Sequence, residues 1–269
     1  MIRSLTKEGY FISEYDKKGL PDTRYLIALR YNIFYHTLHS SSLMSEKLLL
    51  LLQLCNSTLP LGAYSYSEGL ETLVEENIII DSKSLNNWLT NELKYGSIRI
   101  ELAIIIRIYN SYLIQDLDNL FYWNNWYSAS RETSELRQQS WQMGKSLLRL
   151  IKTFETDNKS LQSVIEGLNN SCNYVVAFGL ITAHWEIKIE NILLGYLHNW
   201  LNNLINVGVK LIPLGQTEGQ QLLLNINKEI LLNLETIINL KDDELSSCSW
   251  GLSLASMKHE NLYSRLFRS

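Results

Sequence analysis

The stretch Glu132–Phe154, ETSELRQQSWQMGKSLLRLIKTF, decides the fold class of this 269-residue chain. Four apolar residues within it follow one another in steps of 7, 4 and 3 positions: Leu136, Met143, Leu147 and Leu150. Such steps return to the same side of an α-helix, so these side chains form one apolar face that suits a protein core. The stretch therefore predicts a long amphipathic helix.

The opposite face of this helix carries amides and paired charges: Arg131, Glu135, Gln138, Gln142 and Arg149. Arg131 and Glu135 are four residues apart, which predicts an ion pair worth only about 0.3 kcal/mol at an exposed site. Gly144, in the middle of the helix, costs about 1 kcal/mol relative to alanine. Such a glycine is tolerated best where another backbone passes close by, although a solvated face with an incidental glycine would give the same pattern.

Helical periodicity continues along most of the chain, whereas we find no alternating strand pattern and no repeat at solenoid spacing. Together with 132–154, the predicted helices are Leu48–Cys55, Ser65–Glu76, Ser84–Tyr95, Ile98–Leu113, Asp118–Tyr127, Ser160–Asn169, Val175–Trp185, Ile189–Leu211, Gln216–Ile238 and Ser256–Phe267. Serines are the candidate caps at three of the helix starts: Ser45, Ser65 or Ser67, and Ser84. The sequence predicts an all-α protein, a single-domain multi-helix bundle of about ten helices.

The first 43 residues differ from the rest, because they mix Lys, Asp, Gly and aromatic residues without a sustained helical period. We predict that residues 1–43 are an N-terminal extension, either disordered or produced by an upstream start codon. The helical domain is then expected to span residues 44–269.

Composition limits the partners and the location of the chain. Hydrophobic residues make up 46% and charged residues 19%, and the formal net charge is -4. This balance argues against binding to nucleic acid or to an anionic membrane, because both need a basic face. The most apolar run, 98–113, contains three charges, so no segment is predicted to span a membrane, and the N-terminus lacks the apolar region of a signal peptide. Three widely spaced cysteines favour a reducing cytoplasm, so we predict a cytoplasmic protein.

We find no residue pattern that matches a catalytic, cofactor or metal site. The segment Gly215–Gly219 lacks the lysine of a phosphate-binding loop and contains a glutamate that would repel phosphate. His36 and His39 have helical spacing, but no further nitrogen or sulfur ligands lie near them. His259 precedes Glu260 without the second histidine of a zinc hydrolase helix. We therefore predict a protein that is not an enzyme and that holds no cofactor or metal stably.

Four segments occur in the order and form of a known family. They are Pro60–Glu71 (PLGAYSYSEGLE), Arg131–Leu147 (RETSELRQQSWQMGKSL), Leu211–Gln220 (LIPLGQTEGQ) and Ala255–Ser269 (ASMKHENLYSRLFRS). The first resembles the N-terminal signature of the UreF family, the second its central helix, the third its PLGQ-x-x-GQ turn and the fourth its C-terminal tail. Any one could arise by chance, whereas all four in register make the chain similar to the UreF family from Pro60 to Ser269.

Two departures from the family pattern are mild. Ala63 stands where the family usually has glycine, a change that matters if the position needs a positive φ angle. Lys210 stands where the family usually has arginine before the PLGQ turn, so the charge is kept but bidentate recognition is lost.

The resemblance implies a dimeric, all-helical urease accessory protein. In that role the protein joins the accessory protein UreD, also called UreH, to the GTPase UreG, and the assembly delivers nickel to the urease apoprotein. The chain would have no catalytic residue and no stably bound cofactor, although Ni²⁺ would pass through the assembled complex.

The resemblance also suggests where the partners bind. The tail, residues 255–269, alternates apolar side chains with three cations, and we expect it to become ordered when UreD binds; the cations are Lys258, Arg265 and Arg268. The expected surface for UreG combines the segment after Pro60 with the polar face of the central helix. Its residues are Tyr64, Ser67, Glu71, Arg131, Glu135 and Gln138.

Two other functions fit the helical pattern. One is a helical enzyme or carrier with His184 or His259 as general base, and the other is a generic helical adaptor unrelated to urease. The enzyme predicts turnover by the purified chain, which the accessory role does not.

Overall fold

The computed structural model of the protein describes residues 3–5, 11–13, 44–168 and 171–268. The chain forms two compact units, Met1–Leu50 and Leu51–Ser269. In the first unit, strands β1 (Arg3–Leu5) and β2 (Phe11–Ser13) pair antiparallel, with Ser4 opposite Ile12. The rest of the predicted extension lies outside the described residues, so its nature and its boundary at residue 44 stay predictions.

Helices form the framework of residues 44–268, which confirms the all-α prediction. Residues 44–54 are helical. The later helices are α2 (Leu70–Glu75), α3 (Ser82–Tyr95), α4 (Ile98–Leu113), α5 (Leu117–Ser130), α6 (Ser134–Phe154), α7 (Lys159–Leu168), α8 (Tyr174–His184), α9 (Ile189–Leu211), α10 (Gln216–Ile238) and α11 (Trp250–His259). Two short 3-10 helices, η1 (Ala63–Ser65) and η3 (Asp242–Glu244), complete the described elements.

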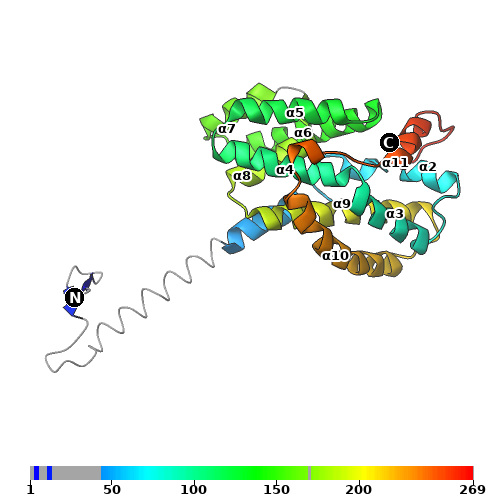
Figure 1. Ribbon diagram of the computed structural model, residues 1–269, viewed down its shortest axis with the longest axis horizontal. Helices are drawn as coiled ribbons and strands as arrows, with labels where there is room; N and C mark the ends of the chain where they lie inside the picture. The colour runs from blue at the N-terminus through cyan, green and yellow to red at the C-terminus, as the bar shows by residue number, and fades with distance from the viewer. Residues whose placement is uncertain (1–2, 6–10, 14–43, 169–170, 269) are drawn as a thin grey trace. The chain divides into compact units, whose positions relative to one another are not determined.

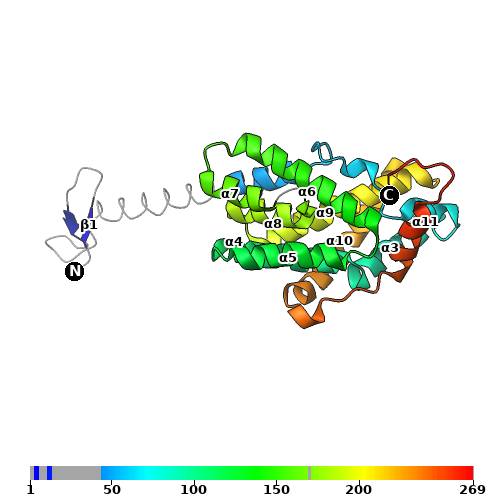
Figure 2. The same cartoon turned by 90° about the horizontal axis from the view of Figure 1, so that it is seen from above.

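Helix α8 is the centre of the unit Leu51–Ser269. Its residues Tyr174–Ala183 are all buried, so the helix has no solvent-facing side along that length. Helices α4 and α6 pack most extensively against it. Helix α5 lies along α4, and α9, α10 and α3 form a second group of packed helices beside them (Figures 1 and 2).

A close approach of two backbones joins α6 to the start of α8. A Cβ atom on Gly144 would overlap the carbonyl oxygen of Cys172 and lie 2.7 Å from the carbonyl carbon of Asn173. Three of the four predicted core residues of α6 are buried, and Leu150 is half-buried. The predicted apolar face and the predicted backbone contact at Gly144 are therefore confirmed.

The predicted helix Ser65–Glu76 is wrong in its first half. Helix α2 begins only after Gly69, whose φ angle of 80° is left-handed and prevents a continuous helix from Ser65. Neither predicted serine caps α2. Ser65 Oγ donates a hydrogen bond of 2.6 Å to the carbonyl of Gly62, and Ser67 is fully buried.

The predicted helix Ser256–Phe267 is also wrong, because α11 starts earlier and ends at His259. Residues 260–268 are not helical. The physical reason lies outside the tail: the backbone N–H groups of Leu266 and Phe267 donate to the side chain of Glu71. A distant carboxylate thus replaces the carbonyl partners that a continued helix would supply.

Two further caps differ from the prediction. Asp81 is the N-cap of α3 and accepts a 2.8 Å hydrogen bond from the backbone N–H of Ser84, so Ser84 is the third helical residue. Ser45 lies inside the helical residues 44–54 instead of preceding them.

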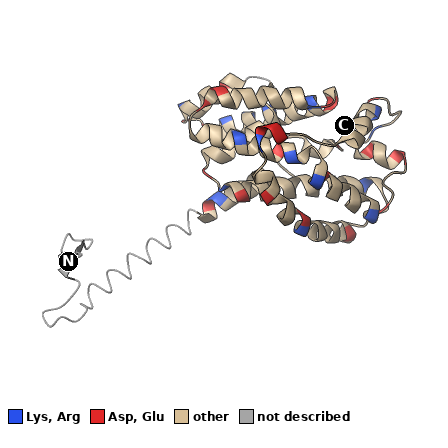
Figure 3. Ribbon diagram, in the orientation of Figure 1, with Lys and Arg blue, Asp and Glu red and all other residues tan. Residues whose placement is uncertain are grey.

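The surface of the described helices agrees with the composition. No helix in the described part of the chain is both long and apolar enough to cross a membrane. Lys and Arg are scattered among Asp and Glu on the helices of residues 51–268, as Figure 3 shows.

Replacing Gly144 with alanine tests the contact between α6 and α8. Helix propensity alone predicts a gain of about 1 kcal/mol for Gly→Ala. Because the new methyl group would overlap backbone atoms, we expect Gly144→Ala to lower the free energy of unfolding by about 1–3 kcal/mol in urea denaturation. Gly251→Ala on α11 is the matched control, since its Cβ position faces open space. Equal effects of the two substitutions would contradict the close contact.

Candidate functional site

A buried carboxylate on α2 holds the end of the chain against the helical domain. Glu71 is 7% exposed, and its two carboxylate oxygens accept hydrogen bonds from the backbone N–H of Leu266 (2.7 Å) and of Phe267 (3.1 Å). The backbone N–H of Arg268 donates to the carbonyl of Ser65 at 2.7 Å. Three consecutive tail residues are thereby fixed to the segment around α2.

A fully buried histidine connects this carboxylate to α6. His259, the last residue of α11, has its Nε2 atom 3.1 Å from Glu71 and its Nδ1 atom 3.4 Å from Glu135. Arg265 Nη1 in the tail lies 3.4 Å from Oε1 of Glu135, an oxygen that is also 3.4 Å from His259 Nδ1. We call Glu71, Glu135, His259 and Arg265 the tail cluster. Its members come from α2, α6, α11 and the tail.

Burial and charge oppose each other at Glu135. Desolvation raises the pKa of Glu135, whereas the neighbouring His259 and Arg265 act to lower it. Beside the cluster, the amine of Lys210 on α9 lies 5.4 Å from the ring centre of Phe267. The tail is therefore held by charge-assisted contacts and by one buried aromatic ring.

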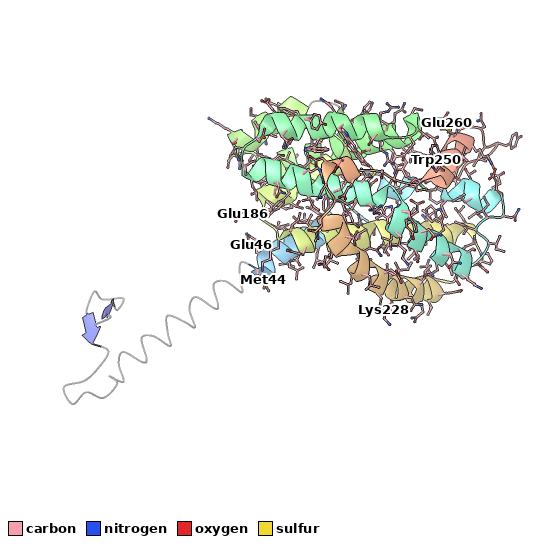
Figure 4. All side chains as sticks on the ribbon, in the orientation of Figure 1. Met44, Glu46, Glu186, Lys228, Trp250 and Glu260 are labelled. Carbon is pink, nitrogen blue, oxygen red and sulfur yellow. The ribbon has the colours of Figure 1, made fainter. Side chains whose placement is uncertain are left out.

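The outer side of α11 is apolar and exposed. Trp250, Leu254 and Met257 are 76%, 56% and 50% exposed, and their spacing of four and three residues puts them on one side of the helix. We call these three residues the α11 stripe. Figure 4 labels Trp250 and Glu260 at the two ends of the helix. Lys258 next to the stripe pairs with Glu76 at 2.6 Å.

A second polar group lies inside the bundle, and Arg131 belongs to it. The Arg131 guanidinium lies 3.3 Å from Glu101 on α4 and donates to the hydroxyl of Tyr127 at 2.9 Å. Tyr196 on α9 also donates to Glu101, at 2.8 Å, and Trp200 Nε1 donates to Glu68 at 3.0 Å. The predicted ion pair between Arg131 and Glu135 is wrong, because each side chain has a closer partner from a distant segment. We call Glu68, Glu101, Tyr127, Arg131 and Tyr196 the polar core.

Two cavities meet at this polar core. One, of about 60 Å³, is bordered by Glu68, Glu101 and Trp200 among others. The other, of about 230 Å³, extends towards Glu132 and Ser247. Tyr127 and Arg131 line both, so this pair forms the wall between them.

Comparison with known proteins decides the family. The family model for UreF matches residues 79–227. The urease accessory protein UreF of Nostoc sp. is 53% identical over 230 residues, which cover 86% of this chain and 99% of that protein. The chain belongs to the UreF family. Further proteins named urease accessory protein UreF, from Microcystis aeruginosa (54% over 224 residues, 83% and 98% covered) and Thermosynechococcus vestitus (44% over 227 residues, 84% and 100% covered), are also similar to it.

The UreF-family residues expected at partner surfaces separate into two groups. Tyr64 on η1 is 66% exposed, and Gln138, Lys258 and Arg268 are also exposed. Arg265 is partly exposed beside Glu135. The others are held inside: Ser67 and Glu71 are buried, and the side chains of Arg131 and Glu135 are only 7% and 16% exposed. These buried residues can position a binding surface, but their side chains contribute little exposed area to it.

The residues that sequence reasoning missed are the partners of these buried groups. Glu101, Tyr127 and Tyr196 come from three helices, and no sequence spacing relates them. His259 was considered as a metal ligand or a base, but its two carboxylate neighbours lie 188 and 124 residues away. Within the described residues, no group of three or more His, Cys, Asp or Glu could hold a metal ion.

Two carboxyl groups around the polar core have raised pKa values. Desolvation raises the pKa of Glu68 to about 7, with repulsion from Glu101 adding to the shift. Desolvation also raises the pKa of Glu92 on α3 to about 7, with contributions from Glu68 and Glu132. Between pH 4.5 and about pH 7, these carboxyl groups therefore hold protons in the folded chain that the unfolded chain would release.

These raised values predict that stability falls as the pH rises. Between the ordinary carboxyl value of 4.5 and about 7, the native state binds more protons than the unfolded chain, so the free energy of unfolding decreases with pH. Glu92→Gln should reduce this loss by about 1 kcal/mol or more between about pH 5 and about pH 7.5, measured by urea denaturation. Glu75→Gln, at an exposed position of α2, is the control. If the free energy of unfolding of Glu92→Gln fell with pH as steeply as that of the parent chain, the raised pKa of Glu92 would be contradicted.

Proposed function

We propose that this urease accessory protein is a cytoplasmic, non-catalytic scaffold that joins a UreD-type protein to a UreG-type GTPase during nickel insertion into apo-urease. In this proposal it acts as a homodimer. Family membership supports the role in urease maturation. The observation that carries the scaffold role is the tail cluster, which fixes the chain end beside an exposed apolar helix face.

The α11 stripe and the tail are the proposed contact for the UreD-type partner. Large exposed apolar side chains in one row are typical of a helix that packs against another protein. Tyr263 and Leu266 extend the apolar surface into the tail, at 105% and 76% exposure. Phe267, by contrast, is only 7% exposed, so it anchors the tail instead of contacting the partner.

The segment 62–69 is the proposed contact for the UreG-type GTPase. Left-handed residues shape it, with φ angles of 80° at Gly62, 50° at Glu68 and 80° at Gly69. The hydrogen bond from Trp200 to Glu68 ties the segment to α9. Tyr64 stands out from this fixed backbone with its ring in solvent. A rigid, exposed tyrosine is a common anchor in protein interfaces.

Ni²⁺ is cargo in this proposal. The carboxylates of Glu68 and Glu101 line the smaller cavity and that of Glu132 lines the larger one. Oxygen donors of this kind bind divalent ions weakly enough for transient passage. Nickel analysis of the isolated chain tests this part. Stoichiometric nickel retained after gel filtration would contradict transient passage.

The contacts of the two candidate bases favour the scaffold over a helical enzyme. His184 Nδ1 lies 2.9 Å from the hydroxyl of Tyr112, and its Nε2 lies 3.3 Å from the amide of Asn158. Both nitrogens of His259 face carboxylates in a ring that is 0% exposed. Neither histidine has a nitrogen directed at a substrate site.

Removing the tail tests the proposed contact for the UreD-type partner. A chain that ends at Glu260 keeps α11 but loses the residues fixed to Glu71. We expect its affinity for a UreD-type protein to fall by about tenfold or more in titration calorimetry. Leu232→Ala, at a 73% exposed position of α10, is the control and should bind normally. Unchanged affinity of the shortened chain would exclude the tail from the contact.

Replacing Tyr64 with alanine tests the GTPase contact. We expect Tyr64→Ala to weaken retention of a UreG-type GTPase on the immobilised accessory complex, with the helical circular-dichroism signal unchanged. Tyr122→Ala on α5, where the side chain is 55% exposed, is the matched control. Equal retention by both variants would place the contact elsewhere, and loss of helical signal in Tyr64→Ala would indicate a structural role for the ring.

A further inference from the structure

We propose that helix α10 carries the contact between two copies of this chain, with the two α10 helices packed antiparallel about a two-fold axis that passes beside Leu231. The homodimer itself is part of the proposed function, on which this inference rests. The residue pattern of α10 adds the face that joins the two copies and the charged side chains that fix their register.

Three large apolar side chains stand in solvent along the outer side of α10. Leu224, Leu231 and Ile238 are 61%, 64% and 36% exposed, and they follow one another at intervals of seven residues. Seven residues make almost two helical turns, so the three side chains form one row along the helix. We call them the α10 stripe. A solvent-exposed apolar row with this heptad spacing is typical of a helix that packs against another helix.

The inner sides of α10 are already occupied by its own chain. Helices α3, α4 and α9 pack against it, and Lys94 on α3 pairs with Glu229 at 3.1 Å. Figure 4 labels Lys228 on the outer side of the helix, at the edge of the helical domain. The stripe is therefore directed away from the core and is accessible to a partner.

Two opposite charges flank the stripe. Lys228 and Glu235 are both exposed, and each lies four residues after a member of the stripe, so both side chains are on the same flank of it. The two residues are about 10 Å apart along the helix axis, which is too far for them to pair with each other. Each charge is therefore available to a group of opposite sign on a partner.

The stripe and the two charges have the same midpoint. Leu231 is the middle member of the stripe, and it lies three residues after Lys228 and four residues before Glu235. When a two-fold axis is perpendicular to two antiparallel helices, the same flank of each helix meets across the contact. An axis beside Leu231 therefore brings Lys228 of each copy opposite Glu235 of the other. This self-complementarity suits a second copy of the chain better than an unrelated helix.

The apolar row and the charges have different roles in this contact. Exposed ion pairs contribute little affinity, so burial of the six aliphatic side chains from the two stripes holds the copies together. The ion pairs select the antiparallel register, as flanking charges do in coiled coils. Leu232 is 73% exposed but lies about 100° around the helix from Leu231, so it is outside the contact.

Sedimentation equilibrium of the full chain tests the face. We expect the parent to form a dimer and Leu231→Glu to raise its dissociation constant by about a hundredfold or more, because two carboxylates would meet at the two-fold axis. Leu232→Glu is the matched control and should dimerise like the parent. Both positions are exposed, so the helical circular-dichroism signal should stay unchanged in both variants. Dimerisation of Leu231→Glu equal to that of the parent would overturn the proposal.

Exchanging the two charges tests the register. Lys228→Glu and Glu235→Lys each place like charges opposite one another twice per dimer, so each should raise the dissociation constant by about fivefold or more at low salt. The double variant restores both ion pairs and should dimerise like the parent. Because the two positions are too far apart to pair within one helix, this rescue arises between the copies. A double variant that dimerises no better than the single variants would overturn the antiparallel contact.

The dimerisation measurements separate this inference from the proposed function. A dimer that survives Leu231→Glu would place the contact on another face and leave the proposed homodimer intact. A parent chain that is monomeric at every concentration would reject the homodimer and this contact together. Affinity of Leu231→Glu for a UreD-type protein, measured by titration calorimetry, should match that of the parent, since the α11 stripe and the tail lie outside α10.

Discussion

Burial of helix α8 on all sides is the constraint on which the rest of the structure depends. An α-helix with no solvent face needs neighbours around its whole circumference, and α4 and α6 are its main ones. The backbone contact at Gly144 sets how closely α6 approaches. Helix α4 carries Glu101, and α6 follows Arg131 and contains Glu135 in its first turn. The packing of α4 and α6 against α8 therefore also sets the positions of the polar core and the tail cluster.

The polar core and the tail cluster have different structural roles. The polar core ties α4, α5 and α9 together through Glu101, which accepts hydrogen bonds from Tyr127 and Tyr196 and pairs with Arg131. The tail cluster uses the same chemistry, buried carboxylates with charged partners, to fix a terminal segment that buries the ring of Phe267 but leaves Tyr263 and Leu266 exposed. A segment held by a few charge-assisted bonds is more easily released than a helix held by a core, which suits a surface that meets partners.

Sequence periodicity predicted the long helices well. It failed where a segment is held by side chains that are distant in the sequence. The apolar face of α6 and the use of Gly144 follow from local spacing and are present as expected. The tail is not helical beyond His259 because Glu71, nearly two hundred residues earlier, binds its backbone N–H groups. Arg131 similarly pairs with Glu101 on another helix instead of with its helical neighbour. Such contacts depend on the fold, so local spacing carries no sign of them, whereas the motifs in register still identified the UreF family.

We propose that the chain joins two other proteins without chemistry of its own. Size-exclusion chromatography with light scattering, on the chain mixed with a UreD-type protein and a UreG-type GTPase, tests it most directly. The account predicts one species that contains all three proteins, with a mass that fits two copies of this chain, and no such species when the chain is omitted. Association of the other two proteins to the same extent in its absence would contradict the account.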